Sequence, residues 1–166
     1  MDFSHDGKLL AHATGNGDVR IWQLDPKRLH MELLEAHPGR QLFSVDFHPT
    51  LPYLISSDAT GRVKIWNVQT GTLRFRLNWD PKLCRRIFYP DGAQFAAAGP
   101  ANVATLVDWS PEESAVTVRR TLEHPLDVFW VDYSQDGRHL ITTCRDERLR
   151  LWSVETGKLL AEIDAF

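Results

Sequence analysis

The 166-residue sequence predicts an all-β protein built from a repeated unit of four short strands. Three observations predict this class. An alternating motif that ends in tryptophan recurs at regular spacing, a second apolar motif recurs between its copies, and turn residues interrupt the chain too often for a helix of about ten residues. The 43% hydrophobic content and the net charge of −3 exclude a disordered chain, because they allow a buried core.

The tryptophan motif appears as VRIW at 19–22, VKIW at 63–66 and LRLW at 149–152. Each copy reads apolar, basic, apolar, tryptophan, which is typical of a β-strand with one buried face. A degraded copy, VATLVDW at 103–109, places Leu106 at the tryptophan position. The spacings between Trp22, Trp66, Leu106 and Trp152 are then 44, 40 and 46 residues, which indicates four copies of one unit.

The second motif sets the register of each unit. It appears as FSVDFHP at 43–49, CRRIFYP at 84–90 and FWVDYSQ at 129–135. The dipeptides Asp6-Gly7, Asp91-Gly92 and Asp136-Gly137 each precede an apolar run and predict hairpins in which both turn residues have positive φ. In the second unit, Thr50-Leu51-Pro52 predicts a longer turn. Strands are expected there at 42–48, 53–58, 62–68 and 72–78.

A four-stranded unit of this length, with a tryptophan near the end of its third strand, resembles a blade of the WD40 β-propellers. The resemblance implies one propeller region over residues 1–166, with units of about 1–36, 37–78, 79–123 and 124–166. About four blades would form an incomplete, open ring, because seven or eight are usual in the family. Either the chain is a fragment of a larger propeller protein, or two chains pair as a homodimer that closes an eight-bladed ring. The shortened first strand favours the fragment.

The resemblance also implies a buried hydrogen-bonded set of histidine, serine or threonine, aspartate and tryptophan in each blade. In the fourth unit this set is His124, Thr142, Asp146 and Trp152. In the second unit it is His37, Ser56 and Trp66, with Thr60 at the position of the aspartate. In the first unit Thr14, Asn16 and Trp22 match loosely. These residues are expected to be structural.

Catalytic signatures are absent from the sequence, so no catalytic residue, metal or cofactor is expected. The chain has no nucleophile elbow, zinc-protease motif or phosphate-binding loop. Gly15-Asn16-Gly17 begins like a dinucleotide loop, but a strand follows, which indicates a hairpin turn. His5 and His48 are a speculative metal pair, and a structural role is favoured for the histidines. The rival hypothesis is a regulatory propeller of a multidomain enzyme whose catalytic part lies outside this chain.

The resemblance implies that proteins or peptides dock on the loops before each first strand, at 35–42, 78–83 and 123–129. Trp79, Trp109 and Trp130 break the regular spacing and are predicted to be exposed anchors. Arg85 and Trp130 occupy the same slot in successive units. The predicted partner-binding residues are Arg40, Lys82, Arg85 and Trp130. Asp2, Asp46 and Asp132 also share a slot, for which a hydrogen bond between blades is favoured over an acidic channel lining.

Charge and composition exclude other partner classes. The 19 Lys and Arg nearly balance the 22 Asp and Glu, which argues against nucleic-acid binding. No apolar run approaches the roughly 18 residues of a membrane span, and the N-terminus lacks the pattern of a signal peptide. Cys84 and Cys144 are too few for a disulfide scaffold, which favours a reducing compartment and predicts a cytoplasmic location.

Overall fold

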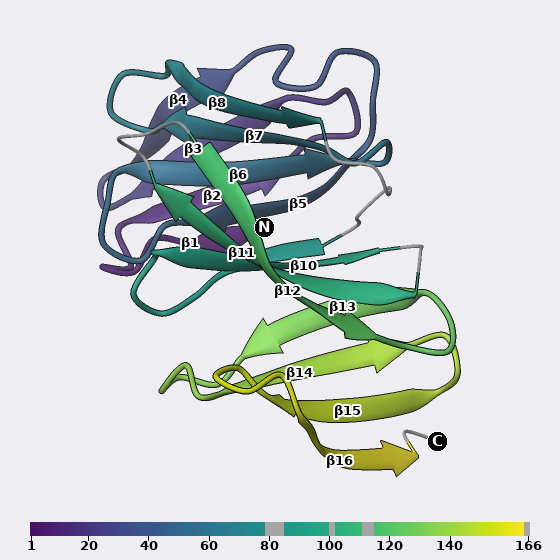
Figure 1. Ribbon diagram of the computed structural model, residues 1–166. Coiled ribbons are helices and arrows are strands. Elements are labelled where there is room, and N and C mark those ends of the chain that lie inside the picture. The colour runs from purple at the N-terminus through teal and green to yellow at the C-terminus, as the bar shows by residue number, and fades with distance from the viewer. Residues whose placement is uncertain (79–84, 100–101, 111–114, 165–166) are drawn as a thin grey trace. The chain divides into compact units, whose positions relative to one another are not determined.

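A computed structural model describes residues 1–78, 85–99, 102–110 and 115–164 (Figure 1). The described residues form four antiparallel sheets, each of four strands joined in chain order, which confirms the predicted class. The chain divides into two compact units, Met1–Asp80 and Pro81–Phe166, with two sheets in each.

The first unit holds the first and second sheets. The first sheet consists of β1 (Asp2–Phe3), β2 (Leu9–Ala13), β3 (Val19–Leu24) and β4 (Lys27–Leu33). The second sheet consists of β5 (Leu42–Phe47), β6 (Tyr53–Asp58), β7 (Arg62–Asn67) and β8 (Leu73–Asn78), within one residue of the expected strands.

The second unit holds the third and fourth sheets. The third sheet consists of β9 (Arg85–Phe88), β10 (Gln94–Gly99), β11 (Val103–Ser110) and β12 (Ala115–Glu123). The fourth sheet consists of β13 (Val128–Tyr133), β14 (His139–Cys144), β15 (Arg148–Ser153) and β16 (Leu159–Asp164). Figure 1 shows β13–β16 as successive neighbours in the fourth sheet.

The core of each unit lies between its two sheets. In the first unit, Ala11 and Ile21 of the first sheet pack against Leu54 and Trp66 of the second. Asp2 adds the hydrogen bond favoured for its slot, because its carboxylate accepts from the backbone N–H of Phe47 at 2.8 Å. In the second unit, the corresponding core contains Ala96, Ala104, Leu106, Leu140 and Trp152.

The predicted alignment of Leu106 with the tryptophans is wrong by one residue. Trp66 pairs with Leu54 and Trp152 with Leu140, and a β-bulge immediately precedes each tryptophan. In the third sheet the same bulge precedes Val107, so Val107 occupies the tryptophan position. Successive strand residues face opposite sides, so this one-residue shift moves Leu106 to the other face of the sheet.

The Asp-Gly turns also differ from the expected type, because only their glycines have positive φ. Gly7 and Gly137 have φ of 69° and 70°, and their N–H groups donate to the carbonyls of Ser4 and Ser134 at 2.8 Å. The Asp6 carboxylate accepts from the Ser4 hydroxyl and from the N–H of Lys8. This hydrogen bonding lets the aspartate keep a negative φ, so a single glycine is sufficient for the turn.

Gly17 allows a close backbone approach between a turn of the first sheet and the segment that leads into the second sheet. Its φ is 89°, and its carbonyl accepts from the N–H of His37 at 2.7 Å. A Cβ atom added at this position would lie 2.0 Å from the His37 carbonyl oxygen. The turn therefore requires glycine both for its conformation and for space.

We expect Gly17→Ala to destabilise the protein by roughly 1–3 kcal/mol, through backbone strain and displacement of residue 37. Gly15→Ala in the same turn is the control, because a Cβ atom there would meet nothing within 4 Å. Chemical denaturation measures both. Equal unfolding midpoints for the two variants would contradict the assignment of Gly17 as a contact between the sheets.

Candidate functional site

Two described loops lead from one sheet into the first strand of the next, where docking was predicted. The 34–41 loop joins the first sheet to the second in the first unit, and the 124–127 loop joins the third sheet to the fourth in the second unit. A buried histidine anchors each loop, His37 in one and His124 in the other.

His37 is held by a chain of hydrogen bonds from the second sheet. The indole N–H of Trp66 donates to Ser56 Oγ at 2.9 Å, and Ser56 Oγ lies 2.9 Å from His37 Nε2. On the other side of the ring, His37 Nδ1 lies 2.9 Å from Asp58 Oδ2. These contacts fit a neutral imidazole that accepts from Ser56 and donates to Asp58. The network therefore fixes the 34–41 loop to strands β6 and β7.

Asp58 was missed by the sequence analysis, which expected the carboxylate at the position of Thr60. Thr60 instead donates its N–H and its hydroxyl to Asp58 Oδ1, each at 2.7 Å. Strand alternation is a signal that could have found the residue, because Ser56 and Asp58 are two apart on β6 and share a face. The second sheet thus contains a complete set, in which the aspartate is Asp58, two residues before the expected position at Thr60.

The fourth sheet builds a similar chain without an aspartate. Trp152 donates to Thr142 Oγ1 at 2.9 Å, Thr142 Oγ1 lies 2.8 Å from His124 Nε2, and His124 Nδ1 donates to the Leu122 carbonyl at 2.8 Å. The expectation that Asp146 belongs to this set is wrong.

Asp146 pairs instead with Arg150, whose two Nη atoms lie 3.1 and 2.5 Å from its carboxylate oxygens. Arg150 is only 4% exposed and also contacts Glu162 at 2.7 Å. A buried guanidinium needs carboxylate partners more than a neutral imidazole does, which explains the exchange. Hydrogen bonds from Arg150 hold the pKa of Asp146 well below its usual range.

The first sheet uses a different acceptor from the one expected. Trp22 donates to His12 Nδ1 at 3.3 Å, and the two rings stack with their centroids 6.5 Å apart. His12 thus occupies the position of Ser56 and Thr142. Thr14 accepts from the backbone N–H of Asp18 in the turn, so it is not the partner of the tryptophan.

The third sheet replaces the polar set with apolar side chains. Ala97 stands at the serine or threonine position, and Phe88 packs against both Phe95 and Trp109. Trp109 is only 5% exposed, so its predicted role as an exposed anchor is wrong. It lies two residues after the tryptophan position, where Val68 and Val154 are buried in the other sheets. Trp79 lies outside the described residues.

Exposed apolar side chains gather at the start of the fourth sheet. Leu126, Phe129 and Trp130 are 44%, 54% and 46% exposed. A β-bulge between Val128 and Trp130 leaves Phe129 without a partner residue in the ladder. Bulges redirect side chains in this way.

Phe43 lies at the equivalent bulge of the second sheet and is 47% exposed. Neither phenylalanine was predicted to be a site residue. The signal was the phenylalanine that begins two copies of the second motif, two residues before Val45 in one and Val131 in the other.

The predicted partner-binding residues have different outcomes. Trp130 is exposed, and it pairs in the sheet with Thr143. Arg85 begins β9 opposite Ala98, which is the equivalent register position. Arg40 is half-buried, and its N–H donates to the His37 carbonyl at 3.1 Å. Lys82 lies outside the described residues. Arg85 and Trp130 lie in the same compact unit, where their strands β9 and β13 are neighbours.

The speculative histidine pair lies along one cavity of about 460 Å³ in the first unit, which His5, His30 and His48 line. His48 Nδ1 accepts from the N–H groups of Thr50 and Leu51 at 3.1 and 2.9 Å. Among the described residues, no three His, Cys, Asp or Glu side chains are grouped to hold a metal ion.

We expect the protein to lose stability as the pH falls below about 6.5, because burial lowers the pKa of both His37 and His124. The unfolded chain then binds protons at these histidines before the folded protein does, which favours unfolding. Calorimetric melting temperatures from pH 8 to pH 5 measure the effect. Exposed His30→Gln is the control and should keep the same pH dependence. A constant melting temperature between pH 7 and pH 5 would contradict the neutral histidines.

Comparison with known proteins identifies the repeat. The family model described as WD domain, G-beta repeat (WD40), matches residues 1–23, 28–67 and 116–153. Human angio-associated migratory cell protein is 27% identical over 159 residues, which are 95% of this chain and 36% of that protein. Periodic tryptophan protein 2 of Saccharomyces cerevisiae is 28% identical over 161 residues, 94% of this chain and 17% of that protein.

Solved structures share the fold. The β-propeller domain of Myceliophteria thermophila Cps50 (Swd1) has a TM-score of 0.83 at 22% identity, covering 98% of this chain and 53% of that one. A chain of the mitotic checkpoint complex has a TM-score of 0.82 at 22% identity, with coverages of 98% and 51%. The chain therefore spans about half of these propellers and about a third or less of those two sequence relatives.

The described residues contain no helix long and apolar enough to cross a membrane. Because the family model matches more than half of the sequence, the chain belongs to the WD40-repeat β-propeller family.

Proposed function

We propose that this chain is a non-catalytic scaffold that docks proteins or peptides, and that the start of the fourth sheet is its principal docking surface. The observation that carries the proposal is the group of exposed apolar side chains at Leu126, Phe129 and Trp130. Aromatic side chains supply most of the binding energy at protein interfaces, because they bury a large area with few rotatable bonds.

The backbone beneath these side chains is fixed. The carbonyl of Pro125 accepts from Asn102 Nδ2 at 3.2 Å, that of Leu126 from Cys144 Sγ at 3.2 Å, and that of Asp127 from the N–H of Arg145 at 2.8 Å. His124 is held by Thr142 at the beginning of the loop. Three successive carbonyls are thus bound while the neighbouring apolar side chains remain in solvent. A rigid surface of this kind loses little entropy when it binds a partner.

The family supports a scaffold, because WD40 proteins are typically non-catalytic, and one similar solved chain comes from the mitotic checkpoint complex. A regulatory propeller of a multidomain enzyme is the second candidate, since the chain spans only part of its relatives. Arg40, Lys82 and Arg85 stay predicted contributors to binding. The cytoplasmic location and the homodimer that closes an eight-bladed ring also stay predictions.

A peptide library displayed on phage tests the docking surface. We expect peptides selected on the wild-type chain to bind the double variant Phe129→Ala, Trp130→Ala at least about tenfold more weakly, because truncation of one hot-spot side chain typically costs about 2 kcal/mol or more. The melting temperature should change little, because both side chains are about half exposed. Fluorescence polarisation measures the affinity.

Val118→Ala is the matched control, because Val118 is 48% exposed on β12 of the neighbouring sheet. This variant should bind the selected peptides like the wild type. Peptides that bind all three proteins equally would refute the proposed surface. A large fall in melting temperature would assign Phe129 and Trp130 to the scaffold.

A further inference from the structure

Two cations face each other across strands β7 and β8 of the second sheet. Lys64 on β7 pairs directly with Arg76 on β8, and Arg62 lies two residues before Lys64 on the same face. Directly opposed side chains have Cβ atoms about 4.5–5.5 Å apart, so like charges at such a position destabilise a sheet. An arrangement that costs stability within the chain requires a compensating interaction or a function.

The equivalent pairs of the first and fourth sheets are ion pairs. Two residues before its tryptophan, the first sheet has Arg20, which pairs with Glu32 at 2.5 Å. At the same position the fourth sheet has Arg150, which contacts Glu162 at 2.7 Å. In the third sheet the pair is neutral, with Thr105 opposite Thr121. The second sheet therefore has an arginine where two of the other sheets supply a glutamate.

The cations of the second sheet line an open groove. Its volume is about 550 Å³, and it is lined by Glu35, Pro38, Arg62, Val63, Lys64 and Arg76. Lys64 Nζ donates to the carbonyl of Ala36 and lies 5.5 Å from the centre of the Trp66 ring. Burial, with the charge of Arg76, lowers the pKa of Lys64, which reflects the missing carboxylate. Arg62 and Arg76 are exposed, and neither forms an ion pair with any described residue.

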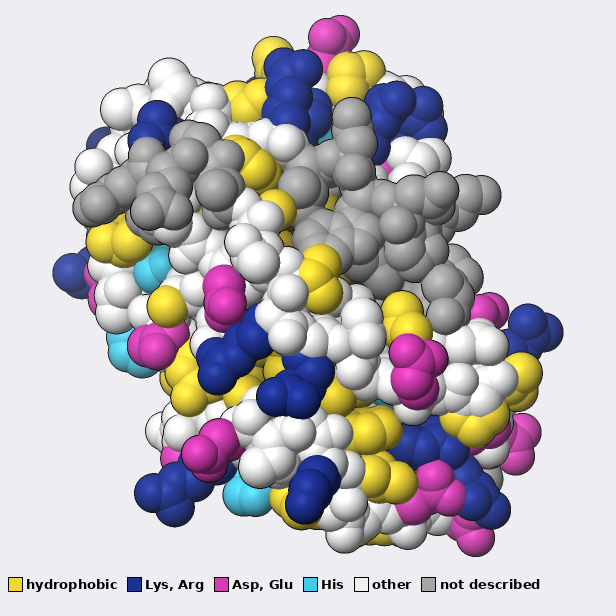
Figure 2. All heavy atoms as spheres, viewed as in Figure 1, with side chains coloured by type: hydrophobic (Ala, Val, Ile, Leu, Met, Phe, Trp, Pro, Cys, Tyr) yellow, Lys and Arg dark blue, Asp and Glu magenta, His cyan; other side chains and the backbone are white. Residues whose placement is uncertain are grey.

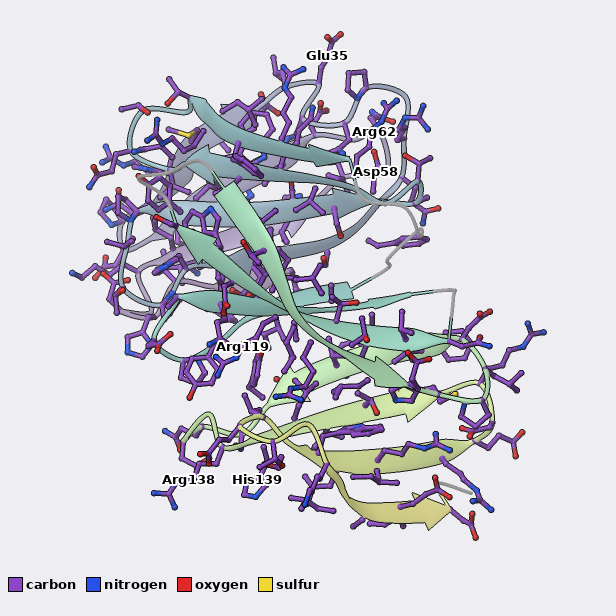
Figure 3. The ribbon with its side chains drawn as sticks, viewed as in Figure 1. Glu35, Asp58, Arg62, Arg119, Arg138 and His139 are labelled. Carbon is purple, nitrogen blue, oxygen red and sulfur yellow. The ribbon has the colours of Figure 1, made fainter. Side chains whose placement is uncertain are left out.

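The acids near the groove balance only part of this charge. Asp58 is buried, and its carboxylate accepts from His37 and Thr60. Glu35 is exposed, and its side chain points away from Arg62 and Asp58 into solvent (Figure 3). No ion pair joins Glu35 to a cation in the described part of the chain. In Figure 2, Lys and Arg side chains gather at the same end of the molecule as Glu35.

We propose that this groove binds a glutamate side chain from an acidic segment of a partner protein. The partner would supply between Lys64 and Arg76 the carboxylate that Glu32 and Glu162 supply within the first and fourth sheets. The guanidinium groups of Arg62 and Arg76 offer paired N–H donors that match a carboxylate. This inference goes beyond the proposed function, because the groove lies in the other compact unit from Phe129 and Trp130.

The test uses the full chain and a fluorescein-labelled peptide of alternating glutamate and glycine, measured by fluorescence polarisation at low salt. We expect Arg76→Glu to weaken binding by about tenfold or more, because it removes a cation and fills the site with a carboxylate. The same variant should raise the melting temperature, because it restores the ion pair of the first and fourth sheets. Arg76→Gln should weaken binding less and should not lower the melting temperature, so the test holds even if Arg76→Glu fails to fold.

Arg28→Glu is the charge-matched control, because Arg28 is exposed on β4, the outer strand of the first sheet. It should bind the peptide nearly as the wild type does. Equal peptide binding by the wild type and Arg76→Gln would overturn the inference. A loss of affinity in Arg28→Glu as large as that in Arg76→Glu would also overturn it, because it would show an effect of net charge alone. Displacement by inorganic phosphate, but not by chloride at equal ionic strength, would identify a phosphate site and would also overturn it. None of these outcomes depends on Phe129 or Trp130, so failure here is distinguishable from failure of the docking surface.

Discussion

The hydrogen-bonded chain from tryptophan through a hydroxyl to a buried histidine determines how the loops of this protein are held. Trp66, Ser56 and His37 form it in the second sheet, and Trp152, Thr142 and His124 do so in the fourth, with all contacts between 2.8 and 2.9 Å. An unpaired polar group in such a site would cost about 1–3 kcal/mol, so the network is stable only when every member has its partner. It therefore fixes each loop in one position relative to its strands.

The other ring nitrogen of the buried histidine, Nδ1, has a different acceptor in each of these two sheets. In the second sheet His37 donates to the carboxylate of Asp58, whereas in the fourth His124 donates to the carbonyl of Leu122. Burial lowers the pKa of both histidines and outweighs the two acceptors, each of which raises it, so both imidazoles stay neutral. The fold thus requires an acceptor at this nitrogen but does not require an aspartate. This freedom leaves the carboxylate of Asp146 available to Arg150.

The four-stranded units could be predicted from the sequence because the positions of strands and turns depend on residues that are neighbours along the chain. Turn glycines and alternating apolar residues place the strands of the second sheet within one residue. The assignment failed where pairing across strands decides the outcome. The bulge before Val107 shifts the register by one residue, which no property of the isolated motif reveals. Asp58 was missed for a similar reason, because a family spacing was applied where the geometry of β6 places another residue beside His37.

The surface residues were the least predictable part of the candidate site. Exposure of Phe129 follows from the bulge in β13, and burial of Trp109 follows from its place two residues after the tryptophan position. Irregular spacing alone could not distinguish buried Trp109 from exposed Trp130, since it marks both exposed anchors and aromatic side chains that fill a core without a polar set.

Equivalent positions of the four sheets differ in what selects their residues. In the second and fourth sheets the tryptophan position faces the core of its compact unit, and the same residue occupies it in both. The outer cross-strand pair, by contrast, is Arg20 with Glu32, Thr105 with Thr121, and Lys64 with Arg76. A cross-strand pair contributes only about 0.2–1 kcal/mol, so the scaffold tolerates opposite, neutral and like charges there. Because packing does not select the residues at this pair, its chemistry is free to differ between sheets, and a pair of like charges is the arrangement that stability alone would not favour.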